Sequence, residues 1–150
     1  MYVKGQRTSL DATTRKIDMI FYREKEIRRA VKNARLESAG GHTGGSSGHA
    51  FVSDPTAVQG IKAATELKSV TLYDGVVVHH PEKWLNVIDA TYARLDDWQR
   101  RAVKMRYQGE KYTEVGAKLH ISKSTYYAMI NEAQHFAIAA ACQFGLIRII

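Results

Sequence analysis

The sequence predicts a mainly α-helical protein with one small β-hairpin and a C-terminal helix-turn-helix. Apolar residues recur at spacings of three and four in several segments, which is the period of a helix with one buried face. Two β-branched runs flank Asp74-Gly75, the strongest short signal for a hairpin. Both prolines, Pro55 and Pro81, stand at the expected first turn of a helix, where a missing N–H costs nothing.

The N-terminal segment is predicted to be one basic helix. Residues 1–8 are expected to be a disordered start, and Ser9 or Asp11 to cap a helix that runs to about Ser38. Its apolar residues recur at helical spacing along a single stripe, in which Glu24 occupies one position. One charge therefore interrupts the face expected to be buried. The basic residues lie mostly off that stripe, where they contact phosphates or a partner helix, or only cover the surface. They are Arg15, Lys16, Arg23, Arg28, Arg29, Lys32 and Arg35.

A linker and a second helix are predicted to follow. Gly and Ser dominate residues 39–52, a composition typical of a flexible linker, and the Gly-Lys-Ser/Thr ending of a phosphate-binding loop is absent there. Asp54 is expected to cap a helix that reaches about Leu67. The predicted organisation has four parts: a basic helix or arm over 1–38, the linker over 39–52, a helix-hairpin-helix segment over 53–93, and a DNA-binding domain over 94–150.

The hairpin and the helices after it are predicted from turn and cap residues. In the hairpin, Val70 and Leu72 lead into Asp74-Gly75, and both turn residues are expected at positive φ. The next helix runs from Pro81 to about Arg94, and Asp96 or Asp97 caps another that stops at Gly109. The first is expected to bury Trp84, Leu85, Val87, Ile88 and Tyr92, and the second Trp98, Ala102, Val103, Met105 and Tyr107.

Residues 112–133 have the pattern of a helix-turn-helix. Thr113 is predicted to cap a short helix, His120 and Ile121 to form the turn, and Ser122 to cap the second helix. The two helices nearly touch, so a small residue is needed at the crossing, and Gly116 fills that place. The apolar positions of the motif are occupied by Val115, Leu119, Ile121, Tyr126 and Met129. The alternative is a plain helical bundle in which Tyr126 and Tyr127 are both core residues.

A helix-turn-helix places the N-terminal end of its second helix in the major groove of DNA. Hydroxyl, amine and amide groups at that end can hydrogen-bond to base edges, and an aromatic ring can contact a sugar or a thymine methyl. The residues predicted to contact bases are Lys123, Ser124, Tyr127 and Asn131. Phosphate contacts, which set register and affinity, are predicted for Thr113, Lys118, Ser122, Thr125, Arg100, Arg101, Lys104, Arg106 and Lys111.

The last helix is expected to reach Phe144, with Gly145 as its stop. The tail over residues 146–150 is so apolar that it is expected to pack back on the protein or to meet a second subunit.

Several motifs between residues 50 and 150 are shared with a known group. They are Trp84-Leu85-Asn86-Val87-Ile88, Tyr92, Arg106-Tyr107, Val115, Leu119, Ile121-Ser122-Lys123-Ser124-Thr125-Tyr126-Tyr127 and Gly145-Leu146-Ile147. In these the chain resembles the RinA/ArpU-type phage late-gene activators. The stretch from Glu114-Val115-Gly116 to Ile121-Ser122 also resembles region 4 of the bacterial sigma-70 factors. The resemblance implies a phage or prophage regulator that binds promoter DNA, acts with RNA polymerase and activates late genes.

The composition is compatible with that expectation. The formal net charge is +7 with a pI of about 9.6, which favours nucleic acid or an anionic membrane as partner. No run approaches the ~18 apolar residues of a membrane span, and Lys4 and Arg7 precede no apolar signal-peptide core. No membrane partner is therefore expected. The single cysteine, Cys142, permits no internal disulfide, in keeping with the cytoplasm of a bacterial host.

No catalytic or cofactor-binding pattern is found. Apart from the adjacent pair His79-His80, the six histidines lack zinc-like spacing. Asp96-Asp97 suits a helix cap better than a nuclease, which needs several converging carboxylates. We therefore expect a non-enzymatic, sequence-specific transcription regulator without metal or cofactor, with double-stranded DNA, RNA polymerase and further copies of the chain as partners. The rival is the small, DNA-recognising subunit of a phage packaging terminase, which also joins a helix-turn-helix to oligomerising helices.

Overall fold

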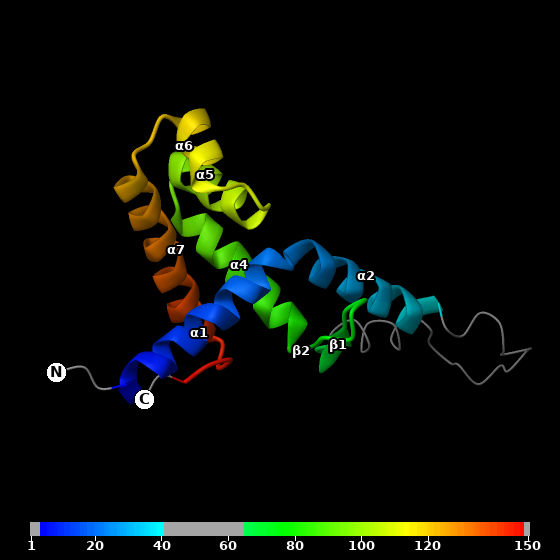
Figure 1. Ribbon diagram of the computed structural model, residues 1–150. Coiled ribbons are helices and arrows are strands. Elements are labelled where there is room, and N and C mark those ends of the chain that lie inside the picture. The colour runs from blue at the N-terminus through cyan, green and yellow to red at the C-terminus, as the bar shows by residue number, and fades with distance from the viewer. Residues whose placement is uncertain (1–3, 41–64, 149–150) are drawn as a thin grey trace, which may run out of the picture. The chain divides into compact units, whose positions relative to one another are not determined.

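The computed structural model describes residues 4–40 and 65–148, a mainly helical chain in which the described part contains one pair of strands (Figure 1). The chain divides into two compact units. The first combines residues 1–24 with residues 83–150, and the second consists of residues 25–82. This division differs from the four-part prediction, because the start of the chain joins the C-terminal unit. No helix in the described ranges is long and apolar enough to cross a membrane.

The N-terminal segment is two helices, so the prediction of one helix from Ser9 or Asp11 to Ser38 was wrong. Helix α1 covers Lys4–Tyr22 and α2 covers Glu24–Gly40, with a turn at Arg23 between them. The break falls directly before Glu24, the charge that interrupts the apolar stripe. On one side of Glu24, the buried residues Ile17, Ile20 and Phe21 belong to the first unit, and on the other the buried Ile27 belongs to the second.

The predicted helix from Asp54 to Leu67 is not seen where the structure describes it. Residues 41–52 of the linker and 54–64 of that helix lie outside the described ranges, and residues 65–67 are not helical. Side chains hold this stretch in place. The Leu67 N–H donates to Glu82 Oε1 (3.2 Å), and Arg35 Nη2 donates to the Thr65 carbonyl (2.8 Å) and pairs with Glu82.

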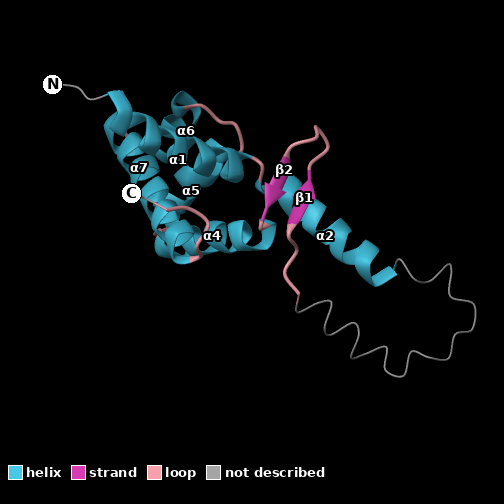
Figure 2. Cartoon of the chain, turned by 90° about the horizontal axis from the view of Figure 1, so that it is seen from below, coloured by secondary structure: helices cyan, strands magenta, loops and turns pink. Residues whose placement is uncertain are grey.

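The predicted hairpin is confirmed. Strand β1 (Ser69–Thr71) pairs antiparallel with β2 (Val77–His79), and Val70 lies opposite Val78 (Figure 2). Val70, Leu72 and Val78 are buried, and the alternate positions of both strands are exposed.

The turn of the hairpin differs from the prediction. The Gly75 N–H donates to the Leu72 carbonyl (2.9 Å), and the Leu72 N–H donates to the Val76 carbonyl (2.8 Å). Gly75 has φ +90°, but Asp74 is not in the left-handed region. These bonds define a three-residue loop that ends in a left-handed glycine, and only that last position needs positive φ.

The first unit is built from α1 and four later helices: α4 (Pro81–Arg94), α5 (Asp97–Tyr107), α6 (Tyr112–Leu119) and α7 (Lys123–Gln143). All five residues predicted to be buried on α4 are buried, as are Ala102, Val103 and Tyr107 on α5. Trp98 is 43% exposed, so its predicted burial was wrong, and Met105 is half-buried. Gln99 is buried instead of Trp98, because its Nε2 donates a hydrogen bond to Glu132 Oε2 (2.9 Å).

Helix α1 is tied into the first unit by polar and aromatic contacts. Asp18 Oδ1 accepts hydrogen bonds from the Tyr107 hydroxyl (2.6 Å) and from Gln134 Nε2 (3.0 Å). The Phe21 ring lies 5.8 Å from the ring of Tyr92 and 5.2 Å from that of Tyr107. Burial, and then the bond to Asp18, raise the pKa of Tyr107.

The predicted stop of the last helix is confirmed. Gly145 has φ +74°, its N–H donates to the Cys142 carbonyl (3.1 Å), and the Leu146 N–H donates to the Ala141 carbonyl (2.9 Å). This is the Schellman pattern of a helix C-terminus. Leu146 and Ile147 are half-buried, and residues 149–150 of the apolar tail lie outside the described ranges.

Candidate nucleic-acid interface

Helices α6 and α7 are joined by a three-residue turn made of the residues predicted for it. His120 adopts the left-handed conformation (φ 55°, ψ 48°), and its N–H donates to the Gly116 carbonyl. The Ile121 N–H donates to the same carbonyl (3.2 Å). A left-handed residue without glycine's freedom costs about 1–2 kcal/mol, so the surrounding contacts hold the turn in this shape.

Gly116 is needed because the turn folds back over it. A Cβ at this position would lie 3.0 Å from Tyr112 Cε2 and 3.2 Å from the Ile121 carbonyl oxygen. These contacts favour a small residue at position 116, as the sequence predicts. The space is limited by the turn and by the Tyr112 ring of α6 itself. The sequence analysis had expected the crossing of two helices to limit it.

The cap of α7 is as predicted, and that of α6 is not. Ser122 is the N-cap of α7, and its Oγ accepts from the Thr125 N–H (3.2 Å). Helix α6 begins at Tyr112 after Lys111, so Thr113 lies in its first turn and the prediction that it caps the helix was wrong. Glu114 serves this end instead, because its carboxylate accepts from the Lys111 N–H (3.2 Å).

The apolar positions of the motif face inward to different degrees. Val115, Leu119 and Tyr126 are buried, whereas Ile121 and Met129 are half-buried. Tyr127 is 42% exposed and Tyr126 only 1%. The two neighbouring tyrosines therefore differ, which argues against the alternative in which both are core residues.

The residues predicted to contact bases lie together on one exposed face. Spacings of three, four and eight along a helix place side chains on the same side, and α7 carries no acidic residue in its first turn. Lys123, Ser124, Tyr127, Ala128 and Asn131 are all exposed. We call Lys123, Ser124, Tyr127 and Asn131 the reading face of α7. Tyr127 remains 42% exposed although its ring packs 5.0 Å from that of Tyr126.

Several of the residues predicted to contact phosphates are already engaged. Arg100 holds the end of α4, because its Nε donates to the Tyr92 carbonyl (3.0 Å), its Nη2 to the Leu95 carbonyl (2.9 Å) and its Nη1 to Asp97 (3.0 Å). Lys118 pairs with Glu110, and Lys104 Nζ lies 5.1 Å from the centre of the Tyr92 ring. Arg101, Lys111, Thr113, Ser122 and Thr125 are exposed, and so are Lys104 and Lys118 despite their contacts.

Arg106 lines a hollow of about 400 Å³ beside the reading face. Its Nη1 donates to the Tyr126 hydroxyl (3.3 Å), its buried Nε has no hydrogen-bond partner, and no carboxylate of the described ranges pairs with it. Burial acts to lower the pKa of this guanidinium, but the bond to Tyr126 and the neighbouring tyrosines raise it overall. The Tyr126 ring packs 5.3 Å from Tyr112 and 5.0 Å from Tyr127. Arg106 is thus a fixed positive charge among tyrosines.

Two residues of this hollow were missed by the sequence argument. Tyr112 could have been found from its spacing, because an aromatic residue four positions before a helical glycine can lay its ring over the missing side chain. Tyr22 comes from α1, far away in the sequence, and no local pattern indicates it.

No family model, curated protein or solved structure matches the chain.

Proposed function

We propose that the protein is a sequence-specific DNA-binding regulator of transcription, in which α6 and α7 act as a helix-turn-helix on duplex DNA. The observation that carries the proposal is the reading face at the N-terminal end of α7, which is exposed and free of acidic residues in its first turn. Backbone N–H groups at a helix N-terminus also attract phosphate.

The reading face has the chemistry for base contacts in the major groove. The Lys123 ammonium group can reach the guanine acceptors, and the Asn131 amide can pair with adenine through two hydrogen bonds. The Ser124 hydroxyl can serve as donor or acceptor, and the exposed ring edge of Tyr127 can contact a thymine methyl. Each good pairing contributes about 1–3 kcal/mol of discrimination against the wrong base.

Phosphate contacts are proposed on either side of the reading face. Arg106 is the strongest candidate, because Tyr126 holds a guanidinium that has no carboxylate partner in the described ranges. Lys111, Thr113, Ser122, Thr125 and Arg101 are exposed and have donors for the same purpose. Lys118, Lys104 and Arg100 would have to leave the contacts they make, so we expect smaller contributions from them.

The wider role rests on the sequence resemblance. It supports a phage or prophage late-gene activator that acts at a promoter with RNA polymerase, as a homo-oligomer in the host cytoplasm. The packaging-terminase alternative predicts a ring-shaped assembly, whereas a regulator protects one promoter-proximal site from cleavage.

Footprinting of the purified full chain on the DNA upstream of its own gene, beside a scrambled duplex, tests the proposal. Lys123→Ala and Asn131→Ala are each expected to reduce the preference for the specific duplex by about 1–3 kcal/mol. Gln143→Ala is the control, because it removes an exposed amide from the other end of α7. Equal losses on specific and scrambled DNA would show that the reading face does not read bases.

A further inference from the structure

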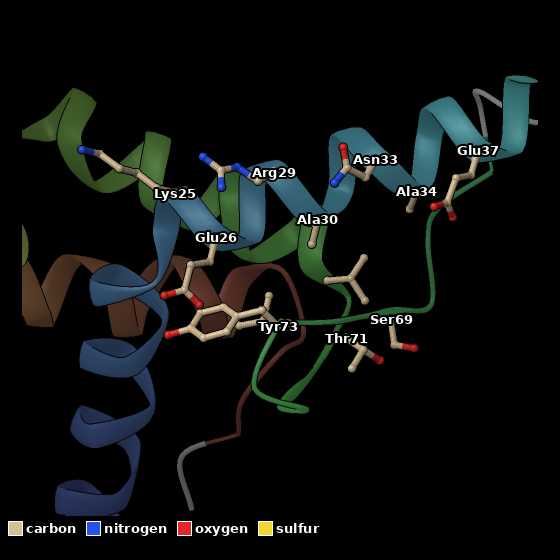
Figure 3. A pocket seen from close by; sticks show the side chains of 12 residues that line it. Lys25, Glu26, Arg29, Ala30, Asn33, Ala34, Glu37, Ser69, Thr71 and Tyr73 are labelled. Atoms are coloured by element: carbon tan, nitrogen blue, oxygen red, sulfur yellow. The ribbon is translucent and has the colours of Figure 1, made fainter.

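The second unit contains a hollow that the proposed DNA-binding function does not use. It has a volume of about 670 Å³ and lies between α2 and strand β1, as Figure 3 shows. Volumes of roughly 300–1,000 Å³ are typical of ligand sites in proteins. All its lining residues belong to the second unit.

One wall of this hollow is an open strand edge. The Lys68 carbonyl accepts from the His80 N–H (2.9 Å) and the Leu72 N–H donates to Val76 (2.8 Å), so residues 68 and 72 bond toward β2. Backbone groups of successive residues in a strand point to opposite sides. The N–H and C=O groups of Ser69 and Thr71 therefore point away from β2, and none has a hydrogen-bond partner in the described ranges.

The other wall is charged at its ends, and its middle contains Asn33 between two alanines. Lys25 and Arg29 are exposed and form no ion pair within the described ranges, whereas Glu26 beside them is already engaged in an interaction. Ala30 and Ala34 follow, and Glu37, exposed and without an ion pair in those ranges, stands at the other end.

The two walls run in opposite directions. In Figure 3, Tyr73 lies toward Lys25 and Glu26, and Ser69 lies toward Ala34 and Glu37. The α2 wall from Lys25 to Glu37 is about 18 Å long at 1.5 Å per residue. Five residues of an extended chain span about 17 Å.

We propose that this hollow binds an extended peptide segment of a partner protein, which adds to β1 as a third, antiparallel strand. Antiparallel pairing is slightly more stable per residue than parallel pairing. It places the N-terminal end of the peptide near Lys25 and Arg29 and its C-terminal end near Glu37. The geometry therefore selects about five residues that begin with an acidic side chain and end with a basic one. Backbone bonds to Ser69 and Thr71 give affinity, and the end charges give direction.

Two peptides of identical composition test the proposal on the full chain. We expect acetyl-DVTVK-amide to bind with a Kd of about 1 mM or tighter, and the swapped acetyl-KVTVD-amide to bind at least about tenfold more weakly, which is 1.4 kcal/mol. Titration calorimetry gives the affinities. Hydrogen exchange of the Ser69 and Thr71 amides, followed by NMR, is expected to slow only with the first peptide.

Variants of β1 and of the peptide both test whether the peptide pairs with β1 through backbone hydrogen bonds. Thr71→Pro removes an N–H that points away from β2 and breaks no bond of the hairpin, a position where proline is tolerated, and it is expected to abolish binding. Thr71→Val keeps the N–H and is expected to bind normally. N-methylation of the peptide at its second or its third residue is expected to abolish binding in only one case, because only alternate N–H groups face β1.

Three binding results would overturn the proposal: no saturable binding of acetyl-DVTVK-amide at about 1 mM, equal affinity for the two peptides, or normal peptide binding by Thr71→Pro. A fourth result would be slower hydrogen exchange of the Thr71 amide at higher protein concentration without any peptide. The last would make a second copy of the chain the occupant. Thr71→Pro is expected to leave DNA binding unchanged, so this test is independent of the function proposed for α7.

Discussion

Substituting Gly116 by alanine tests the turn on which the proposed DNA interface depends. The new Cβ meets Tyr112 Cε2 at 3.0 Å and the Ile121 carbonyl oxygen at 3.2 Å. Overpacking of this kind costs about 1–3 kcal/mol, and alanine returns about 1 kcal/mol of helix propensity. We expect a net loss of about 1 kcal/mol. The ring can move aside, but the carbonyl belongs to the turn, so relief of the contact displaces the start of α7.

Urea unfolding followed by circular dichroism measures the stability term, and DNA affinity measures the displacement. A loss of about 1 kcal/mol corresponds to a fall in Tm of roughly 2–4 °C for a chain of this size. Tyr112→Ala supplies the matched background, because it removes one of the two contacts. The cost of Gly116→Ala should shrink there, with a coupling of at least about 0.5 kcal/mol. Additive effects, or a Gly116→Ala protein as stable and as tightly DNA-bound as wild type, would refute the reasoning.

Three further predictions follow from the contacts described. Ser122→Ala loses the cap of α7 and should lower the free energy of unfolding by about 1 kcal/mol. Ser122→Asp keeps a cap and should leave the stability unchanged, but its charge should repel phosphate and weaken DNA binding. Equal DNA affinity of the two variants would show that Ser122 is not part of the interface. His120→Gly relieves the left-handed conformation, but glycine loses more backbone entropy on folding, so we expect a net gain in stability of about 0.5–1 kcal/mol. The gain is measured as a higher urea midpoint, and a lower midpoint would mean that the His120 side chain stabilises the turn. Burial raises the pKa values of Tyr92 and Tyr107 in the folded protein. The unfolded state therefore loses these two protons at lower pH, and the free energy of unfolding should fall as the pH rises above about 10. A spectrophotometric titration in which all eight tyrosines ionise together without unfolding would contradict this.

Short-range signals predicted most of the local structure of the first unit. Asp96 caps α5, Ser122 caps α7, and Gly145 ends α7, because each acts on backbone groups within a few residues. The apolar spacing on α4 was sufficient for the same reason, since one helical period decides which side chains are inside. The exposure of the reading face was also predicted from spacing alone.

Errors arose where a distant partner decides the outcome. Trp98 is exposed because Gln99 finds Glu132 on another helix, and hydropathy alone does not reveal that bond. The helix is broken at Arg23 because the apolar residues before and after it belong to different units. Arg100 was counted as a phosphate contact from its charge, whereas the carbonyls that hold it lie at the end of the preceding helix.

The order of elements along the chain separates the two proposed activities. Helix α1 and α4 to α7 form one unit although residues 25–82 stand between them in sequence, so the second unit is an insertion into the first. The bonds of Asp18 to Tyr107 and Gln134 fix α1 to α5 and α7, and none of them involves the inserted residues. The open edge of β1 and the reading face therefore belong to different units of the chain. An effect of that peptide on DNA binding would require different contacts with the DNA-bound and the free protein, because an equilibrium shifts only through differential contacts with its two states.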